Sequence, residues 1–430
     1  MPGTVLVMPS YRQAGTVLTD HVFPVPLDHD RPDGERIEVF AREVAAADRA
    51  AANLPWLVFL QGGPGFGAPR PHGRDSWLGR ALADYRVLLL DQRGTGRSTP
   101  ASRQTLAGTA GDQARYLAHF RADSIVRDAE LIRQAVTGGE PWSVLGQSFG
   151  GFCTVTYLSL APEGLKEAFI TGGLPGLDTS ADDVYRLTYG KVRAKTWEHY
   201  QRYPGDADQA RRVARRLRDG DVVLPSGAPL TVEAFQSLGQ MLGASTGGDD
   251  LHYLLEDPFA GGGLSDDFLH AAEHRLSFAT GPLYAVLHEA CYAQGTATRW
   301  AAQRIRAEFG EFDRALDGDG PLLFTGEMIY PWMFDTDPVL RPLRGAADVL
   351  AEREDWPPLY DPARLAANEV PVAAAIYFND MYVPAELSVP AGQAIRGLKA
   401  WVTSEYEHDG LRVSNGAVLD RLIALARGTA

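Results

Sequence analysis

One serine in the chain lies in a setting that favours nucleophilic chemistry. Ser148 is the centre of the G-x-S-x-G segment 146–150, which follows the apolar run "WSVLGQ" and precedes the helical pattern "GFCTVTYLSLAP". Flanking glycines allow a turn too tight for larger residues, and such a turn lifts the serine hydroxyl clear of the backbone. The short motif alone is common, so its place between a predicted strand and a predicted helix carries the interpretation. The sequence therefore predicts that Ser148 is a nucleophile.

A nucleophilic serine needs hydrogen-bond donors for the oxyanion that its attack creates. The backbone N–H of Phe149 is one candidate donor, because it directly follows the serine. The N–H of Gly63 is the second, because it lies in the loop "QGGPGFGAPRP" that follows the predicted strand "WLVFL". The same loop also fits the G-x-G-x-x-A dinucleotide fingerprint. That fingerprint must open a helix, and the two prolines that follow oppose one.

The remaining members of a catalytic triad are expected in the order acid, then histidine. Among ten histidines, only His408 lies after the long helical region, in "SEYEHDGLR". Asp380 ends the preceding strand pattern "AAAIYFND". Asp380 would orient the imidazole, and His408 would take the proton from Ser148 and pass it to the leaving group.

Strand and helix patterns alternate through the first part of the chain and return near its end. This alternation predicts an α/β fold with a mostly parallel sheet flanked by helices. We expect residues 1–177 and 366–430 to form this unit and residues 178–365 to form a mainly helical inserted domain. The pattern "DSIVRDAELIRQAV" predicts a helix with Asp123 or Ser124 as N-cap. A further helical segment is expected over "LYAVLHEACYAQGTATRWAAQRI".

The composition excludes several classes of protein. The 430 residues include 41 Lys and Arg against 55 Asp and Glu, a net charge of −14, which opposes nucleic-acid binding. The basic segment 211–218 is expected to be the solvated face of a helix. No apolar stretch approaches the roughly 20 residues of a membrane span, and no leader pattern is seen. Two cysteines exclude a disulfide framework and favour a cytoplasmic location. The oligomeric state stays open.

Taken together, "GGPGFG", "LLLDQRGTGRS", "GQSFGG", "FNDMYV" and "EHDGLR" resemble the proline iminopeptidases, which are serine peptidases of the α/β-hydrolase superfamily. The length and the insertion are similar to the larger bacterial form of that family. The resemblance implies an α/β-hydrolase fold with a helical cap, and release of an N-terminal residue, preferentially proline, from peptides with a free N-terminus. It implies no cofactor and no metal. One departure is Gln61, where the shorter form typically has histidine.

The resemblance also implies that glutamates of the cap bind the α-amino group of the substrate. The candidates are Glu289 and Glu327, since both lie among apolar and aromatic residues. Tyr292, Tyr330 and Trp332 are candidates for the pocket that receives the pyrrolidine ring. Each of the five could instead be an ordinary cap residue, on a helix surface or in the cap core.

Three alternatives remain open at this point. An esterase or amidase of the same fold would act on uncharged acyl groups and would have no use for paired acids in its pocket. A zinc peptidase could use "HAAEH" at 270–274, which fits H-x-x-E-H, although no third ligand is evident. A catalytically silent binding protein is the third, but such proteins usually lose the nucleophile or the histidine.

Overall fold

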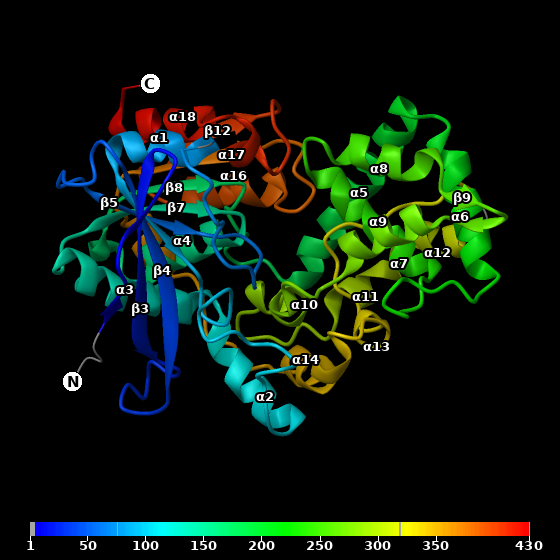
Figure 1. The fold of residues 1–430 in the computed structure, drawn as a ribbon, viewed down its shortest axis with the longest axis horizontal. Helices are drawn as coiled ribbons and strands as arrows, with labels where there is room; N and C mark the ends of the chain where they lie inside the picture. Colours follow the sequence, from blue (N-terminus) through cyan, green and yellow to red (C-terminus); the bar gives the residue numbers. More distant parts are fainter. Residues whose placement is uncertain (1–4, 75, 318–319, 430) are drawn as a thin grey trace.

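The computed structural model describes residues 5–74, 76–317 and 320–429. Its centre is a ten-stranded mixed sheet in the order β1-β3-β4-β6-β5-β7-β8-β11-β12, with β2 paired to β3 (Figure 1). The expected α/β class and mostly parallel sheet are confirmed. The strands of this sheet are β1 (Leu6–Val7), β2 (Tyr11–Gln13), β3 (Thr16–Pro26), β4 (Arg36–Ala46), β5 (Trp56–Leu60), β6 (Arg86–Leu90), β7 (Trp142–Gln147), β8 (Leu165–Thr171), β11 (Val372–Tyr377) and β12 (Lys399–Thr403).

The six strands from β6 to β12 run parallel, whereas the N-terminal strands are antiparallel. Apart from the exposed edge strand β12, the parallel strands are short and almost wholly buried runs, because helices cover both of their faces. The sequence did not predict β3, which contains Pro24 and Pro26. Both prolines lie beyond Val22, the last β3 residue paired with β1, so their missing N–H groups cost the sheet little.

Two helical layers enclose the sheet and form its two cores. The layers lie below and above the sheet in Figure 1. Helix α3 begins at Ala122 and uses Arg121 as its N-cap without a side-chain bond, so the predicted caps Asp123 and Ser124 are wrong; both lie in the first turn. The helices of this unit are α1 (Ser76–Asp84), α2 (Ala110–Leu117), η1 (Ala118–Phe120), α3 (Ala122–Thr137), α4 (Phe149–Leu160), η2 (Pro162–Gly164), α16 (Ala385–Ala394), α17 (Gly410–Val413) and α18 (Ala417–Arg427).

The chain between β8 and β11 is mainly helical and lies on the right of Figure 1. Its elements are α5 (Ala181–Arg202), α6 (Asp206–Arg218), α7 (Val232–Gln236), η3 (Ser237–Gly243), α8 (Gly247–Glu256), β9 (Phe259–Ala260), β10 (Gly263–Leu264), α9 (Asp266–Leu276), α10 (Pro282–Leu287), η4 (Glu289–Cys291), α11 (Ala301–Arg306), α12 (Glu311–Asp317), α13 (Met333–Thr336), η5 (Arg341–Leu343), α14 (Arg344–Ala351) and α15 (Pro362–Ala366). The continuous helical segment expected from residue 283 is wrong. It breaks after η4, and Gly295, Arg299 and Trp300 have positive φ before α11 begins.

The boundaries of this helical region bear on the division into domains. The expected boundary at 177/178 falls between β8 and α5, whereas the one at 365/366 falls inside α15. Helix α15 packs against α4 and α16, which cover the sheet. We therefore propose that the inserted unit ends before α15, and "the cap" below means residues 178–361.

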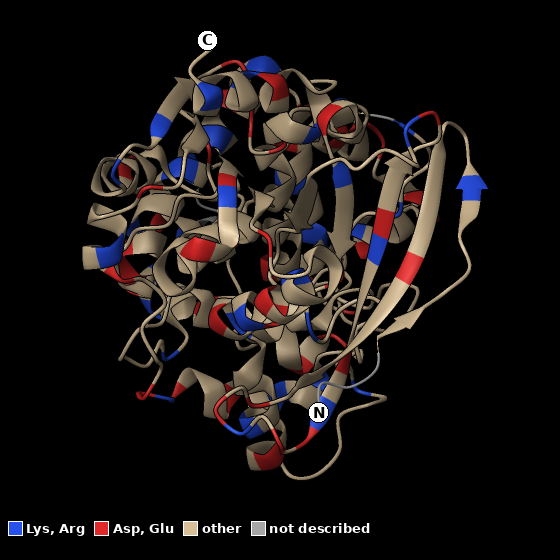
Figure 2. Ribbon diagram, turned by 90° about the vertical axis from the view of Figure 1, so that its left-hand side faces the viewer, with Lys and Arg blue, Asp and Glu red and all other residues tan. Residues whose placement is uncertain are grey.

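The basic segment 211–218 belongs to α6, whose apolar face is buried against the cap. Arg211 pairs with Asp208 one turn earlier, and Arg212 lies over the ring of Phe259. Figure 2 shows the same mixing elsewhere, with basic and acidic residues interspersed along the elements. In the part of the chain that the structure describes, no helix has the length and apolar character needed to cross a bilayer.

Arg93 is a buried cation that ties the segment after β6 to two other parts of the fold. Its guanidinium contacts both oxygens of Asp128 on α3 at 2.6 and 2.7 Å. It also donates to the carbonyl oxygens of Pro26, Leu27 and His119. Because the side chain is fully buried, the pair stabilises the fold only while every partner is present.

We therefore expect Asp128→Ala to lower the free energy of unfolding by about 3–5 kcal/mol, because it leaves the Arg93 charge buried without its anionic partner. Urea denaturation would measure the change. The matched control is Asp30→Ala, which breaks the exposed Arg127–Asp30 pair and should change stability by less than about 1 kcal/mol. Equal effects of the two substitutions would contradict this assignment.

Candidate active site

The turn at Ser148 has the strained geometry that the sequence motif predicts. Ser148 has φ of 57° and ψ of −125°, between the end of β7 and the start of α4. A β-carbon at Gly146 would lie 2.2 Å from the Gly150 carbonyl oxygen. One at Gly150 would lie 1.9 Å from the Leu60 carbonyl oxygen. Both positions therefore require glycine, and the serine lies at the carboxyl edge of the sheet.

Asp380 and His408 meet at the same edge. Asp380 follows β11 and His408 follows β12, and the Asp380 Oδ2 to His408 Nδ1 distance is 2.6 Å. The turn at Gly172 and Gly173 after β8 lies between this pair and the serine. A β-carbon at Gly172 would be 3.1 Å from His408 Nδ1, and one at Gly173 would be 2.4 Å from the Ser148 carbonyl oxygen. The fold thus gathers the three residues of the predicted triad at one edge of the sheet.

Backbone N–H groups fix the carboxylate of Asp380 independently of its contact with the imidazole. Its Oδ1 accepts the backbone N–H groups of Tyr382 at 2.8 Å and Val383 at 3.1 Å. Oδ2 remains for His408. Burial opposes the charged imidazole, but Asp380 and Glu327 outweigh that effect, and the pKa of His408 is raised. Such a carboxylate fixes the tautomer that leaves Nε2 available as a base.

The glycine loop after β5 lies directly against the nucleophile. A β-carbon at Gly62 would be 2.8 Å from Cβ of Ser148 and 3.4 Å from its Oγ. Gly63 has φ of 142°, a conformation that side chains rarely allow. A β-carbon at Gly65 would lie 2.4 Å from the backbone nitrogen of Tyr284 in α10. The loop is therefore enclosed between the serine turn and the cap. The next helix, α1, begins only at Ser76, well after Ala68, so the loop does not open a helix as the dinucleotide fingerprint requires.

Gln61 supports this loop through its side-chain amide. In the amide orientation that satisfies its neighbours, its oxygen accepts from the Gly62 N–H at 3.3 Å and from Arg412 Nη2 at 2.9 Å. Arg412 also donates to Gln147, the residue before the serine, at 3.0 Å. The Arg412 guanidinium in α17 thus connects the glycine loop after β5 with the end of β7.

Glu327 comes from the cap and lies near enough to Asp380 and His408 for their charges to interact. Its Oε1 accepts from the Tyr284 hydroxyl at 2.7 Å, and that hydroxyl accepts from the Gln240 amide at 2.9 Å. Burial raises the pKa of Glu327 to about 7, while Tyr284 and His408 work in the opposite direction. A carboxylate in such a site would gain stability from a cationic partner.

Glu289 is buried in the cap and contacts the start of a helix. Its Oε2 accepts the N–H of Ala301 at 3.0 Å, and its Oε1 accepts the N–H of Ala302 at 2.9 Å. These are the first N–H groups of α11, which have no partner within the helix. The carboxylate therefore caps α11, and a place for Glu289 in the amine pocket with Glu327 stays a prediction.

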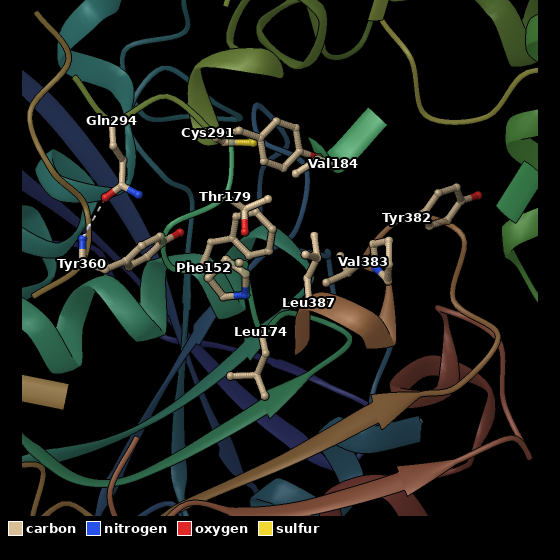
Figure 3. Close-up of a pocket in the computed structure, with 14 residues that line it drawn as sticks. Phe152, Leu174, Thr179, Val184, Cys291, Gln294, Tyr360, Tyr382, Val383 and Leu387 are labelled. Carbon is tan, nitrogen blue, oxygen red and sulfur yellow. Dashed lines mark hydrogen bonds between the residues drawn. The ribbon is translucent and has the colours of Figure 1, made fainter. Parts of the chain in front are cut away.

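The three aromatic candidates lie in two different places, two of them together in the cap and one at a pocket. Tyr330 is fully buried in the cap, where its hydroxyl lies 2.7 Å from that of Tyr189, and Trp332 stacks on its ring. Only Tyr292 lines a pocket near the serine turn. That pocket, shown in Figure 3, has about 370 Å³ of empty space, a volume that includes space open to solvent. Its wall is largely apolar and includes Phe152, Leu174, Val184, Cys291, Tyr292, Tyr360, Tyr382 and Leu387.

The alternative zinc site is not assembled. His270 and His274 lie exposed on α9, and Glu273 accepts a hydrogen bond from the backbone of Ser226. Within the described ranges no group of three or more His, Cys, Asp or Glu side chains could hold a metal ion.

Three residues of the site had no assignment from the sequence: Gln240, Tyr284 and Tyr382. Tyr382 lies two residues after Asp380, and its ring meets the His408 ring edge-on at 4.8 Å. Its position in "FNDMYV" was the only signal available. Gln240 and Tyr284 lie in cap segments far away in sequence, so only the fold brings them to the site.

Known proteins that are similar to this chain indicate the same fold. The family model described as "alpha/beta hydrolase fold" matches residues 55–258. A proline iminopeptidase of Aeromonas sobria is 52% identical over 409 residues, which cover 95% of this chain and 96% of that protein. A proline iminopeptidase of Aspergillus aculeatus is 36% identical over 418 residues, which cover 94% and 92%.

The place of Glu289 predicts a stability effect. Glu289→Ala should lower the free energy of unfolding by about 2 kcal/mol, because two buried N–H groups of α11 lose their acceptor. Thermal and urea denaturation would measure it. Glu354→Ala, which removes an exposed partner of Arg299, is the control and should cost less than about 1 kcal/mol. An unchanged stability in Glu289→Ala would contradict the capping role.

Proposed function

Because this chain belongs to the proline iminopeptidase family of α/β-hydrolases, we propose that it is a serine aminopeptidase that releases an N-terminal residue, preferentially proline, from peptides. The observation that supports the proposal is the desolvated carboxylate of Glu327, which accepts from Tyr284 and whose charge interacts with those of Asp380 and His408. A carboxylate in that position suits a substrate whose amino group lies next to the bond to be cleaved.

In the proposed reaction Ser148 Oγ attacks the carbonyl carbon of the N-terminal residue. His408 takes the hydroxyl proton, and Asp380 stabilises the resulting imidazolium through the 2.6 Å contact with Nδ1. The N–H groups of Gly63 and Phe149 would hold the oxyanion. The close approach of the glycine loop to Ser148 supports this role, since no side chain separates the two.

Collapse of the tetrahedral intermediate breaks the C–N bond and leaves an ester between Ser148 and the N-terminal residue. His408 gives its proton to the departing amine, which leaves as the new N-terminus of the shortened peptide. Water, deprotonated by His408, then attacks the ester, and Ser148 recovers its proton. No step requires a metal or a cofactor.

We propose that Glu327 binds the α-amino group, with Tyr284 fixing its orientation. A cation in a desolvated site needs a compensating charge, and Glu327 would supply it. N-acetylation removes both the charge and a hydrogen-bond donor, so the blocked substrate would leave Glu327 without a partner. This asymmetry is the physical basis of selection for a free N-terminus.

The pyrrolidine ring would occupy the pocket of Figure 3. Phe152, Leu174 and Tyr292 give it an apolar wall, and Tyr382 connects it to the catalytic histidine. A ring of proline size buries its methylene groups there at about 0.8 kcal/mol each. We assign Tyr292 to this pocket and leave Tyr330 and Trp332 to the cap core.

We further propose peptides with a free N-terminus as the partners of this protein and no nucleic acid, in keeping with its net charge of −14. We also propose a cytoplasmic location. Both cysteines are free buried thiols, which suits a reducing compartment.

The first test compares proline β-naphthylamide, its N-acetyl derivative and a simple aryl ester such as p-nitrophenyl acetate. The wild type should cleave the free-amine amide and discriminate against the acetylated one by about a hundredfold or more, while Ser148→Ala should lose on the order of 10³-fold or more of the activity. Ester cleavage together with indifference to N-acetylation would instead indicate an esterase. Full activity in Ser148→Ala would overturn the mechanism.

The second test uses pH. Amine binding needs the charged form of Glu327, whose pKa is raised by burial to about 7, and catalysis needs neutral His408. We therefore expect kcat/KM to fall as the pH is lowered through about 7. Three charged groups face His408, namely Asp380, Glu327 and Arg412; the two carboxylates raise its pKa and Arg412 lowers it.

In Glu327→Gln one of these carboxylates is removed. The acid limb of the kcat/KM profile then reports His408 alone and should move to lower pH. The same variant should lose most of its preference for the free amine. Glu289→Gln is the matched control and should keep both the pH profile and the preference. An unmoved acid limb in Glu327→Gln would contradict the assignment of Glu327.

A further inference from the structure

One short cap helix contacts both the amine site and the catalytic loops. Helix η3 spans Ser237–Gly243, and residues near its end reach Tyr284 on one side and the loops of Asp380 and His408 on the other. These contacts form a continuous series of hydrogen bonds, in which each link is a separate contact of the structure.

The first links belong to the amine site. The Tyr284 hydroxyl donates to Glu327 Oε1 at 2.7 Å and accepts from Gln240 Nε2 at 2.9 Å. Tyr284 lies in α10 and is itself buried, so its hydroxyl has few alternatives. The position of the Glu327 carboxylate is therefore set from η3 through one tyrosine.

The next links lead from the same glutamine to the catalytic pair. The Gln240 carbonyl oxygen accepts the Tyr382 hydroxyl. The Tyr382 N–H donates to Asp380 Oδ1 at 2.8 Å, and its ring meets the His408 ring edge-on. In Figure 3 the Tyr382 hydroxyl points away from the other pocket residues, which leaves it free for this contact with the cap.

Helix η3 also contacts the loop that carries His408 directly, and its packing is close. The Gly243 carbonyl oxygen accepts the His408 N–H at 3.1 Å. A β-carbon at Gly243 would lie 2.2 Å from Cζ of Tyr382, so the helix and the tyrosine touch backbone to ring. One at Gly239 would lie 2.3 Å from Cβ of Phe324, close to Glu327 in sequence. Packing this close lets η3 act as a rigid connection between Glu327 and the Asp380–His408 pair.

The rigidity of this connection has a consequence for catalysis. The anchored α-amino group fixes one end of the N-terminal residue, and the base and nucleophile act about two bonds away. If the anchor and the base keep a constant separation, binding energy at the amine aligns the carbonyl for attack and raises kcat. If they move independently, the same energy lowers only KM.

We propose that Gln240 and Tyr382 are positioning residues that connect the amine-binding Glu327 to the Asp380–His408 pair through η3, so that a free N-terminus is selected in the catalytic step as well as in binding. This inference rests on the proposed aminopeptidase function. It adds two residues, and a route between two sites, that the reaction itself does not require.

The test is a double-mutant cycle of Glu327→Gln and Tyr382→Phe in the full chain, with proline β-naphthylamide as substrate. Tyr382→Phe removes the bond to Gln240 but keeps the ring on His408 and the N–H to Asp380. It should lower kcat with little change in KM. The double variant should lose about tenfold less in kcat/KM than the product of the single losses, because both substitutions break one route. Gln240→Met should reproduce the behaviour of Tyr382→Phe.

The readout that separates positioning from a merely structural role is p-nitrophenyl acetate, which has no amine. With this ester the coupling between Glu327→Gln and Tyr382→Phe should vanish. Tyr377→Phe is the matched control, since its hydroxyl bonds Thr171 near Asp380 but lies outside the route. Its effect should combine additively with that of Glu327→Gln.

Additive behaviour of the Tyr382→Phe cycle, or equal coupling with both substrates, would overturn the inference while leaving the proposed function intact. A wild-type enzyme that cleaves the ester but not proline β-naphthylamide would overturn the proposed function first. The two failures are therefore distinguishable.

Discussion

The backbone-to-backbone contact between the start of α4 and the end of β5 is the constraint from which the catalytic geometry follows. A β-carbon at Gly150 would lie 1.9 Å from the Leu60 carbonyl oxygen, and one at Gly62 would lie 2.8 Å from Cβ of Ser148. Helix, strand and glycine loop can approach this closely only where side chains are missing. The contact forces Ser148 into positive φ and holds its hydroxyl beside the glycine loop to which we assign the oxyanion donor.

Parallel strands explain why residues from five loops meet at that contact. Strands β5, β7, β8, β11 and β12 all end at the same edge, so the loops that follow them converge. Arg412 and Gln61 then connect the loops laterally, as do the two glycines after β8. This half of the site belongs to the sheet and could support several hydrolytic reactions.

The cap supplies what makes the site selective. Glu327, Tyr284 and Gln240 come from three separate cap segments, and none of them neighbours a catalytic residue in the chain. The Glu327 carboxylate is costly to ionise because it is desolvated, and a cationic ligand offsets that cost. The buried pair of Arg93 and Asp128 shows the contrasting case, a charge whose partners are all built into the fold.

The sequence by itself determined the α/β class, and it predicted the insertion and the members of the triad. It could do so because a nucleophile turn, buried parallel strands and the order of acid and histidine are local or ordered patterns. The same reasoning could not separate Glu327 from Glu289, since both lie in apolar surroundings along the chain. Only the tertiary structure showed that Glu289 caps α11, and only it brought Gln240 and Tyr284 to Glu327. The helix caps, the break after η4 and the strand β3 were decided by packing for the same physical reason: contacts between residues distant in sequence outweigh local preferences.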